Sequence, residues 1–136
     1  MLGHVVCRDG VLVDHAKIVI ILDLPPPTTV KQLCTTLVQT WYYRKFIKGY
    51  AEVTSPMEKL LKKDIKFQWI ESSQESLDML KNKMGTVPIL LFLDWKKYFH
   101  VHVNVSSFVL DMVLTHPNEG SIDHPIALAS RKLFAI

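Results

Sequence analysis

The chain has 136 residues, of which 49% are hydrophobic, so it has enough apolar side chains for a core and is not a disordered segment. That length fits one ordinary domain or pieces of two. No apolar run approaches the roughly 20 residues that span a bilayer, and Met1 begins no basic-then-apolar signal sequence. We therefore expect no membrane partner and an intracellular location, cytoplasmic or nuclear, in which Cys7 and Cys34 stay free thiols.

The net charge of +3 is distributed unevenly along the chain. Residues 25–69, called the helical block below, hold eight Lys or Arg side chains against three acidic ones, a net charge of +5. Residues 1–24 hold two against three, and residues 70–136 hold six against seven. Such a basic surface suits a phosphate backbone. Charge runs are also common on solvated helices, so composition alone leaves both interpretations open.

The first expected element is a β-hairpin within residues 2–13. Apolar runs flank Arg8-Asp9-Gly10, and Asp-Gly is a strong hairpin signal. Asp14 can then cap a short helix through Ile18–Leu22, whereas the β-branched residues of that run favour a strand on propensity alone. Pro25 ends either element, because proline has no amide donor and fixes its own φ.

The helical block is expected to begin with a helix capped by Thr29 and Gln32. These residues match the capping box, in which each side chain satisfies one orphan amide at a helix start. Apolar residues then follow at the spacing of one helical face: Val30, Leu33, Cys34, Leu37, Val38 and Trp41. Gly49 is the expected stop signal.

A second helix is expected to open at Ser55-Pro56. Serine caps helices, proline suits the first helical position, and Glu58 closes the box. The residues of its core face are Met57, Leu60 and Leu61. Three lysines lie on or near the other side: Lys59, Lys62 and Lys63.

A third helix follows Trp69. Ser72 and Glu75 fit a capping box, and Gly85 followed by Pro88 ends the helix. Its apolar stripe is Leu77, Leu80 and Met84.

The spacing of the apolar residues then changes from about 3.6 residues, as in a helix, to 2 residues, as in a strand. Phe99, Val101, Val103 and Val105 alternate with His100, His102 and Asn104, which predicts a half-buried strand. Ser106-Ser107 turns the chain into a second strand, Phe108–Leu114, and Asn118-Glu119-Gly120 turns it into a third, Ile126–Ser130. The predicted fold class is α+β: a helical bundle after an N-terminal hairpin, followed by a partial three-stranded antiparallel sheet.

The helical block resembles the thumb of gypsy-type long-terminal-repeat retrotransposon reverse transcriptases. The matching residues are Pro25-Pro26-Pro27-Thr28, Val30-Lys31-Gln32-Leu33, Tyr42-Tyr43-Arg44-Lys45-Phe46-Ile47, Pro56-Met57, and Leu60-Leu61 through Phe67-Gln68-Trp69. The family has small glycines at the positions of Val38 and Trp41. Bulky residues there are expected to disturb close helix packing.

The resemblance extends over nearly the whole chain. Leu2-Gly3-His4 is similar to the end of the family's palm, and His100–Ser107 with His124–Leu133 is similar to the opening of its ribonuclease H domain. It implies a helix after Asp14. The implied regions are 1–24 (end of the palm and first thumb helix), 25–69 (thumb), 70–97 (connection) and 98–136 (truncated N-terminal part of a ribonuclease H-like domain).

Ribonuclease H chemistry needs carboxylates that hold two metal ions. The resemblance puts the first of them at Asn104, whose neutral amide lowers the charge that holds a hard cation. The family has a small residue at Asp111, which receives no catalytic role. No Tyr-x-Asp-Asp polymerase motif occurs in the chain. The intact family enzyme uses Mg²⁺, whereas we expect this chain alone to bind no metal or cofactor and to be inactive.

The resemblance implies weak, sequence-independent contact with template-primer duplex, either RNA–DNA or DNA. The residues expected to make it are Lys31, Arg44, Lys45 and Lys48. Tyr42, Tyr43 and Phe46 could stack on bases or pack the bundle, and packing is the expected role of Phe46 and Trp41.

The sequence is therefore interpreted as a piece of a retrotransposon Pol polyprotein, with the rest of that polyprotein as its partner. Because later strands of the domain would follow Ile136, one face and one edge of Tyr98–Ser130 should stay exposed and favour non-specific self-association. The main alternative is a host-adopted helical protein-interaction module. A weaker alternative is a metal-binding protein that uses His100 and His102 with His116 or His124. It is weaker because a tetrahedral metal site needs four converging ligands.

Overall fold

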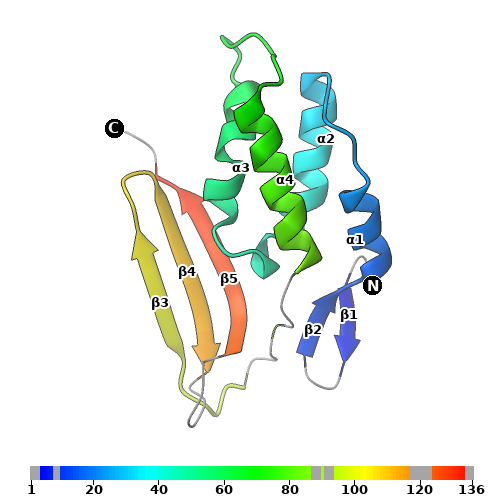
Figure 1. Cartoon of the computed structure of the whole chain (residues 1–136). Coiled ribbons are helices and arrows are strands. Elements are labelled where there is room, and N and C mark those ends of the chain that lie inside the picture. The colour runs from blue at the N-terminus through cyan, green and yellow to red at the C-terminus, as the bar shows by residue number, and fades with distance from the viewer. Residues whose placement is uncertain (1–3, 8–9, 87–89, 91–93, 117–123, 134–136) are drawn as a thin grey trace.

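The computed structural model describes residues 4–7, 10–86, 90, 94–116 and 124–133. A hairpin and a bundle of helices stand beside a three-stranded sheet (Figure 1). The elements are β1 (His4–Cys7), β2 (Gly10–Val13), α1 (His15–Leu22), α2 (Val30–Trp41), the 3-10 helix η1 (Arg44–Phe46), α3 (Tyr50–Glu58), the 3-10 helix η2 (Lys59–Leu61), α4 (Glu71–Gly85), β3 (His100–Val105), β4 (Val109–His116) and β5 (His124–Lys132). None of the described helices combines the length and apolarity of a membrane span.

The N-terminal hairpin and its following helix are confirmed. β1 pairs with β2 antiparallel, with Cys7 opposite Gly10, while the turn residues themselves lie outside the described part of the chain. The Asp14 carboxylate accepts a hydrogen bond from the Ala16 amide at 3.0 Å, so it caps α1. The cap and the core contacts of Ile18 therefore outweigh the strand propensity of this run.

The Thr29 cap of α2 is also confirmed. Its hydroxyl accepts from the Gln32 amide at 3.2 Å. The Gln32 side chain, however, accepts from the amide of Thr28 at 2.8 Å rather than from that of Thr29, so the box closes one residue earlier than expected.

The predicted apolar stripe of α2 is confirmed at Leu33 and Leu37 and is wrong at Val30, Cys34, Val38 and Trp41, which are exposed. The residues that α2 buries are Leu33, Thr36, Leu37 and Thr40, whereas Val38 is 69% and Trp41 54% exposed. Threonine fits the buried face because its hydroxyl bonds back to the helix: Thr40 Oγ1 donates to the Thr36 carbonyl at 3.1 Å. Val38 and Trp41 face outward, so their bulk does not disturb helix packing.

The second predicted helix starts earlier than Ser55. Gly49 adopts the left-handed conformation (φ 70°) and is the N-cap of α3 rather than a stop for α2. Pro56 lies inside α3. The amide that Pro56 lacks would have bonded to the carbonyl of Glu52, an exposed residue. The predicted core positions Met57 and Leu60 are buried, as expected.

The third helix, α4, begins at Glu71 without a side-chain cap, so the box predicted at Ser72 and Glu75 is wrong. Its apolar stripe is confirmed, since Leu77, Leu80 and Met84 are fully buried. The small Ser76 is buried too and donates a hydrogen bond to the carbonyl of Val53 on α3. This bond explains how α3 and α4 pack closely. The helices share one core with β2 and Leu90.

The three strands form an antiparallel sheet in the order β3-β4-β5, as predicted. α3 and η1 pack on β5. The face that meets the helices carries Ser130 of β5, which accepts a hydrogen bond from the Ala51 amide of α3 at 2.6 Å, and the buried apolar residues Val109 and Leu128. The expectation of a half-buried β3 is wrong, because every residue of β3 is exposed. Its valines point to the face away from the helices.

The Ser130–Ala51 hydrogen bond couples sheet and helices. Ala51 is in the first turn of α3, where amides have no intrahelical partner, and Gly49 has no side chain to supply one. Replacing Ser130 with Ala is expected to lower the free energy of unfolding by about 1–3 kcal/mol, because a part-buried amide loses its acceptor. Urea denaturation followed by circular dichroism measures this. Ser107→Ala, at an exposed turn, is the matched control and should cost less than ~0.5 kcal/mol.

Candidate nucleic-acid interface

All eight cationic side chains of the helical block are exposed. Within the described residues, none of them forms an ion pair; the ion pair that does involve the block joins Glu58 to Lys132 of β5 at 2.6 Å. The positive charge of the block is therefore available to a ligand from solvent. The cations fall into two groups at opposite ends of α3, with Lys31 as an eighth position.

The first cation group consists of Arg44, Lys45 and Lys48, which lie on η1 and in the loop before α3. The Arg44 guanidinium lies 3.5 Å from the centroid of the Trp41 ring and donates to the Trp41 carbonyl at 3.2 Å. This stack fixes the direction of a planar five-donor group, which is the geometry that suits phosphate oxygens. The ammonium of Lys45 lies 5.5 Å from the centroid of the Phe46 ring.

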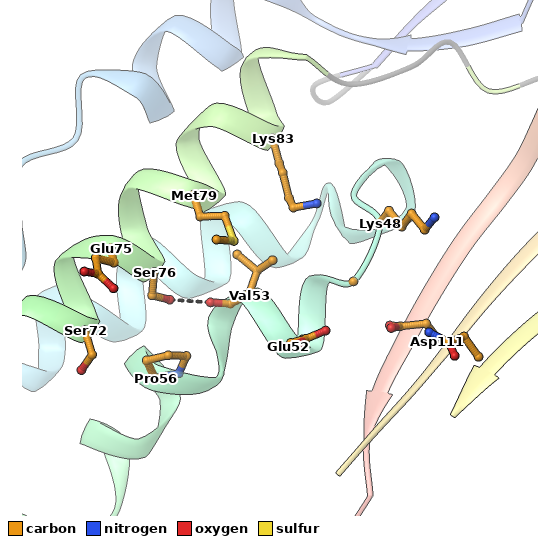
Figure 2. Close-up of a pocket in the computed structure, with 12 residues that line it drawn as sticks. Lys48, Glu52, Val53, Pro56, Ser72, Glu75, Ser76, Met79, Lys83 and Asp111 are labelled. Carbon is orange, nitrogen blue, oxygen red and sulfur yellow. Dashed lines mark hydrogen bonds between the residues drawn. The ribbon is translucent and has the colours of Figure 1, made fainter. Parts of the chain in front are cut away.

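Lys48 occupies a different setting from Arg44. It lines a cleft of about 520 Å³ between α3, α4 and the sheet. Figure 2 shows Lys48 and Lys83 reaching into this cleft from the helical side, with Glu52 on α3 and Asp111 on β4 as the nearby acidic residues. Lys48 therefore shares its surroundings with carboxylates, whereas Arg44 and Lys45 face solvent.

Lys31 is separated from the first cation group. It lies at the start of α2, and a 12-residue helix is about 18 Å long, so α2 places Lys31 and Arg44 at its two ends. The start of α2 instead lies at the end of the bundle that carries η2 and the following loop (Figure 1). The second cation group there consists of Lys59, Lys62, Lys63 and Lys66. The sequence interpretation counted these lysines as charge without assigning them to the site.

The aromatic residues of the block divide between core and surface. Phe46 is buried, as expected, and so is Tyr43, whose pKa is raised by burial and further by neighbouring Tyr42 and Asp14. Tyr42 is exposed and meets the Tyr43 ring edge-on. Trp41 was expected to pack the bundle, which is wrong, since it is exposed beneath Arg44. Trp41 and Tyr42 are thus the aromatics that a base could reach.

Asn104 lies directly opposite Asp111 in the β3–β4 ladder, and both line the 520 Å³ cleft. One carboxylate oxygen of Asp111 is buried and has no hydrogen-bond partner among the residues that the structure describes. Domains of the ribonuclease H-like class generally use Mg²⁺, yet no three His, Cys, Asp or Glu side chains converge anywhere in the described ranges. The donors at this position, one amide and one carboxylate, do not fit a two-metal site.

The strand histidines are arranged for hydrogen bonding. His116 is buried, its Nε2 accepts from the Asp94 amide at 3.0 Å, and its Nδ1 lies 3.0 Å from the Tyr98 carbonyl, so both ring nitrogens have hydrogen-bond partners. Nε2 of His102 lies 3.2 Å from the Thr115 hydroxyl. The structure does not bring His116 together with His100 and His102 as metal ligands. The side chain of His124 lies outside the described part.

Comparison with known proteins identifies the class of protein to which this sequence and fold correspond. Residues 69–135 match the model of the RNase H-like domain found in reverse transcriptase. The chain is 34% identical over 97% of its length to the retrovirus-related Pol polyprotein from transposon opus of Drosophila melanogaster, and 35% identical over 97% to that from transposon 297. It is 33% identical over 78% of its length to an uncharacterized mitochondrial protein of Arabidopsis thaliana, of which it covers 68%.

Solved structures of reverse transcriptases share the fold of this chain. The foamy viral protease-reverse transcriptase in complex with double-stranded DNA superposes with a TM-score of 0.83 and 20% sequence identity, over 97% of this chain and 23% of that one. The chain spans 14% of the opus polyprotein and 12% of the 297 polyprotein. Residues 69–135 belong to the family of RNase H-like domains found in reverse transcriptase, and the chain corresponds to the reverse transcriptase/RNase H-like region of retrotransposon Pol polyproteins.

Proposed function

We propose that this chain binds nucleic-acid duplex, RNA–DNA hybrid or DNA, weakly and without sequence preference, as the thumb-bearing part of a Pol polyprotein. The observation that carries the proposal is the set of eight exposed cations on the helical block, none of them ion-paired within the described residues. Unpaired surface cations release counterions from a phosphate backbone, which drives sequence-independent binding.

The fold relatives support this proposal. Foamy viral protease-reverse transcriptase structures that share the fold are complexes with double-stranded DNA and with an RNA/DNA hybrid. The proposed contact residues are Lys31, Arg44, Lys45 and Lys48, with the stacked pair of Trp41 and Arg44 as the most rigid element. The remainder of the Pol polyprotein is the proposed partner, and an intracellular location, cytoplasmic or nuclear, follows from that role.

The proposed role of Mg²⁺ belongs to the intact enzyme and not to this chain. The ion would need further carboxylates beside the position of Asn104. Asn104 contributes a neutral oxygen, and Asp111 is the carboxylate opposite it.

Neutralising the first cation group tests the proposal. The triple variant Arg44→Gln, Lys45→Gln, Lys48→Gln is expected to bind a fluorescent RNA–DNA hybrid more weakly. Its slope of log K against log salt concentration should be about 2.7 smaller if all three residues contact phosphates, since each contact contributes about 0.9 on a B-form duplex. Fluorescence anisotropy across a salt series measures both quantities.

The matched control removes the same charge elsewhere, by Lys17→Gln, Lys96→Gln, Lys97→Gln at three exposed positions. It should retain the parent slope. If both triple variants lose the same slope, binding follows net charge and the first cation group is not the contact surface.

A second candidate function is docking of an apolar helix from another protein. α2 carries exposed Val38 and Trp41, and these line a groove of about 420 Å³ between α2, α3 and η2. The other residues of the groove are Cys34, Leu37, Tyr50, Glu58 and Leu61. Salt separates the two functions, because apolar docking changes little with salt whereas phosphate binding weakens steeply.

A further inference from the structure

Helix α2 carries an exposed stripe on the side away from the shared core. Exposed residues at i, i+3, i+7 and i+10 share one face of this helix, namely Lys31, Cys34, Val38 and Trp41. Val38 is 69% and Trp41 54% exposed. The last three residues of the stripe form one wall of the groove of about 420 Å³ between α2, α3 and η2.

The rest of the groove is apolar and is built within the helical block. Leu61 of η2 lines it from the other side, together with the buried side chains of Leu37 and Tyr50. The Tyr50 hydroxyl donates to the Leu37 carbonyl at 3.4 Å and lies 3.2 Å from the Thr40 hydroxyl, so its polar end is already bonded to α2. All lining residues fall within residues 34–61, one continuous described segment.

Glu58 is the acidic residue that lines the groove, and its charge is compensated. One carboxylate oxygen accepts from the Thr54 hydroxyl at 2.9 Å. The other forms the ion pair with Lys132 at 2.6 Å. Among the described residues that line the groove, no uncompensated negative charge therefore opposes an acidic ligand.

Cations stand at both ends of the groove. At one end the Arg44 guanidinium lies 3.5 Å from the centroid of the Trp41 ring. Lys31 lies at the other end, and Lys62 follows η2 at the same end of the bundle (Figure 1). The ten residues from Lys31 to Trp41 rise about 15 Å along α2. Residues 32–43 contain no Lys, Arg, Asp or Glu, so the middle of the stripe is uncharged.

This pattern of charge distinguishes between possible ligands of the groove. A duplex carries one negative charge per about 1.7 Å of its axis, which makes about nine charges over 15 Å. The groove offers cations at its ends alone, so a duplex that followed it would leave most phosphates over apolar side chains. A helix with an apolar face and acidic residues beyond both ends of that face matches the groove along its whole length.

We propose that this groove binds an acidic amphipathic helix of a second protein. Apolar side chains of that helix at i, i+3, i+4 and i+7 would pack between Val38 and Leu61. Its carboxylates would pair with Arg44 at one end and with Lys31 at the other. The proposal rests on the second candidate function above and names its partner. Because Arg44 and Lys31 are also proposed duplex contacts, the helix and the duplex exclude each other.

Peptide binding tests the proposal. The probe is a fluorescent helical peptide with leucines at i, i+3, i+4 and i+7 and glutamates beyond both ends of that stripe. Fluorescence anisotropy is expected to show binding of this peptide to the chain. Two control peptides should bind at least roughly tenfold more weakly. One has lysines in place of the glutamates, and the other has alanines in place of the leucines, which preserves helix propensity.

Substitutions in the chain locate the contact. Val38→Glu puts a carboxylate in the groove and is expected to raise the Kd of the glutamate peptide roughly tenfold or more. Ile20→Glu on α1 is the matched control, because Ile20 is 54% exposed, does not line the groove and gives the same change in net charge. It should keep the parent affinity. The double variant Lys31→Gln, Arg44→Gln should lose the preference for glutamates over lysines. Circular dichroism checks that each variant folds.

Three results would overturn the proposal: no binding of the glutamate peptide, equal binding of the glutamate and lysine peptides, or equal weakening by Ile20→Glu and Val38→Glu. Binding of RNA–DNA hybrid by the same variants is measured separately, so a failure of peptide docking is distinguished from a failure of duplex binding. If Val38→Glu weakened hybrid binding and left peptide binding intact, the groove would be assigned to the duplex instead.

Discussion

The unmodified chain is expected to show neither polymerase nor ribonuclease H activity with Mg²⁺ or Mn²⁺, and Asn104→Asp alone is expected to leave it inactive. Polymerisation by this class relies on paired aspartates, and no Tyr-x-Asp-Asp motif occurs in the sequence. Hybrid cleavage needs several carboxylates acting together. Residues that act as a unit are lost together, so restoring one ligand does not restore a site.

The ladder register adds a physical consequence of that substitution. Because Asn104 faces Asp111 across β3 and β4, Asn104→Asp places two carboxylates directly opposite each other. Like charges in this arrangement destabilise a sheet by up to ~1 kcal/mol. The variant is therefore expected to be slightly less stable than the parent, in addition to being inactive.

A graft separates the effect of residue 104 from the effect of the later part of a ribonuclease H domain. An intact ribonuclease H remainder of the family is joined after Ile136, once with Asn104 retained and once with Asn104→Asp, and cleavage of a labelled hybrid is followed on a gel. Cleavage is expected from the aspartate version alone. Equal cleavage from both would mean that position 104 is not the first metal ligand, and hybrid cleavage by the unmodified chain would refute the interpretation of this chain as inactive.

Elements with a local signal could be predicted from sequence. Asp14 and Thr29 each cap a helix through a bond within three residues, and such bonds depend little on the rest of the fold. The three strands and their antiparallel order follow from the period-2 pattern and from the resemblance, which also placed Asn104 in a strand. Domain boundaries at residues 24, 69 and 97 remain predictions.

Features set by tertiary contacts could not be predicted. The Ala51 amide of α3 donates to Ser130, which is 79 residues away in sequence. No local sequence pattern predicts this hydrogen bond. Alternation in β3 identified two faces but not which one meets the helices. The helices cover the face that carries Ser130 and Lys132, which bond to the Ala51 amide and the Glu58 carboxylate of α3.

The sequence predicted which charged residues the candidate interface contains, but not how they are arranged in space. The excess charge of the helical block is real and exposed, yet α2 separates Lys31 from Arg44, and Lys48 lies in a cleft with acidic neighbours. The stack of Arg44 on Trp41 could have been predicted from sequence, because the two residues are three apart, which is the spacing of one helical turn.

The corrected face of α2 gives the second large expected effect. Leu33 and Val38 both lie on the predicted stripe, yet Leu33 is fully buried against the shared core whereas Val38 is 69% exposed. Leu33→Ala is expected to cost about 2–5 kcal/mol, because it removes buried methyl groups and leaves a cavity. Val38→Ala should change stability by less than ~0.5 kcal/mol, since it uncovers nothing and alanine has the higher helix propensity.

Thermal and urea unfolding of the two variants measure the difference. For a chain of this size, a loss of about 3 kcal/mol lowers the melting temperature by roughly 10 °C, and it removes a large part of a total stability of about 5–15 kcal/mol. Met57→Ala on α3, at another fully buried position, should fall in the range of Leu33→Ala and serves as the positive control. If Val38→Ala cost as much as Leu33→Ala, the stripe read from sequence would face the core after all, and the outward position of Trp41 beneath Arg44 would have to be abandoned with it.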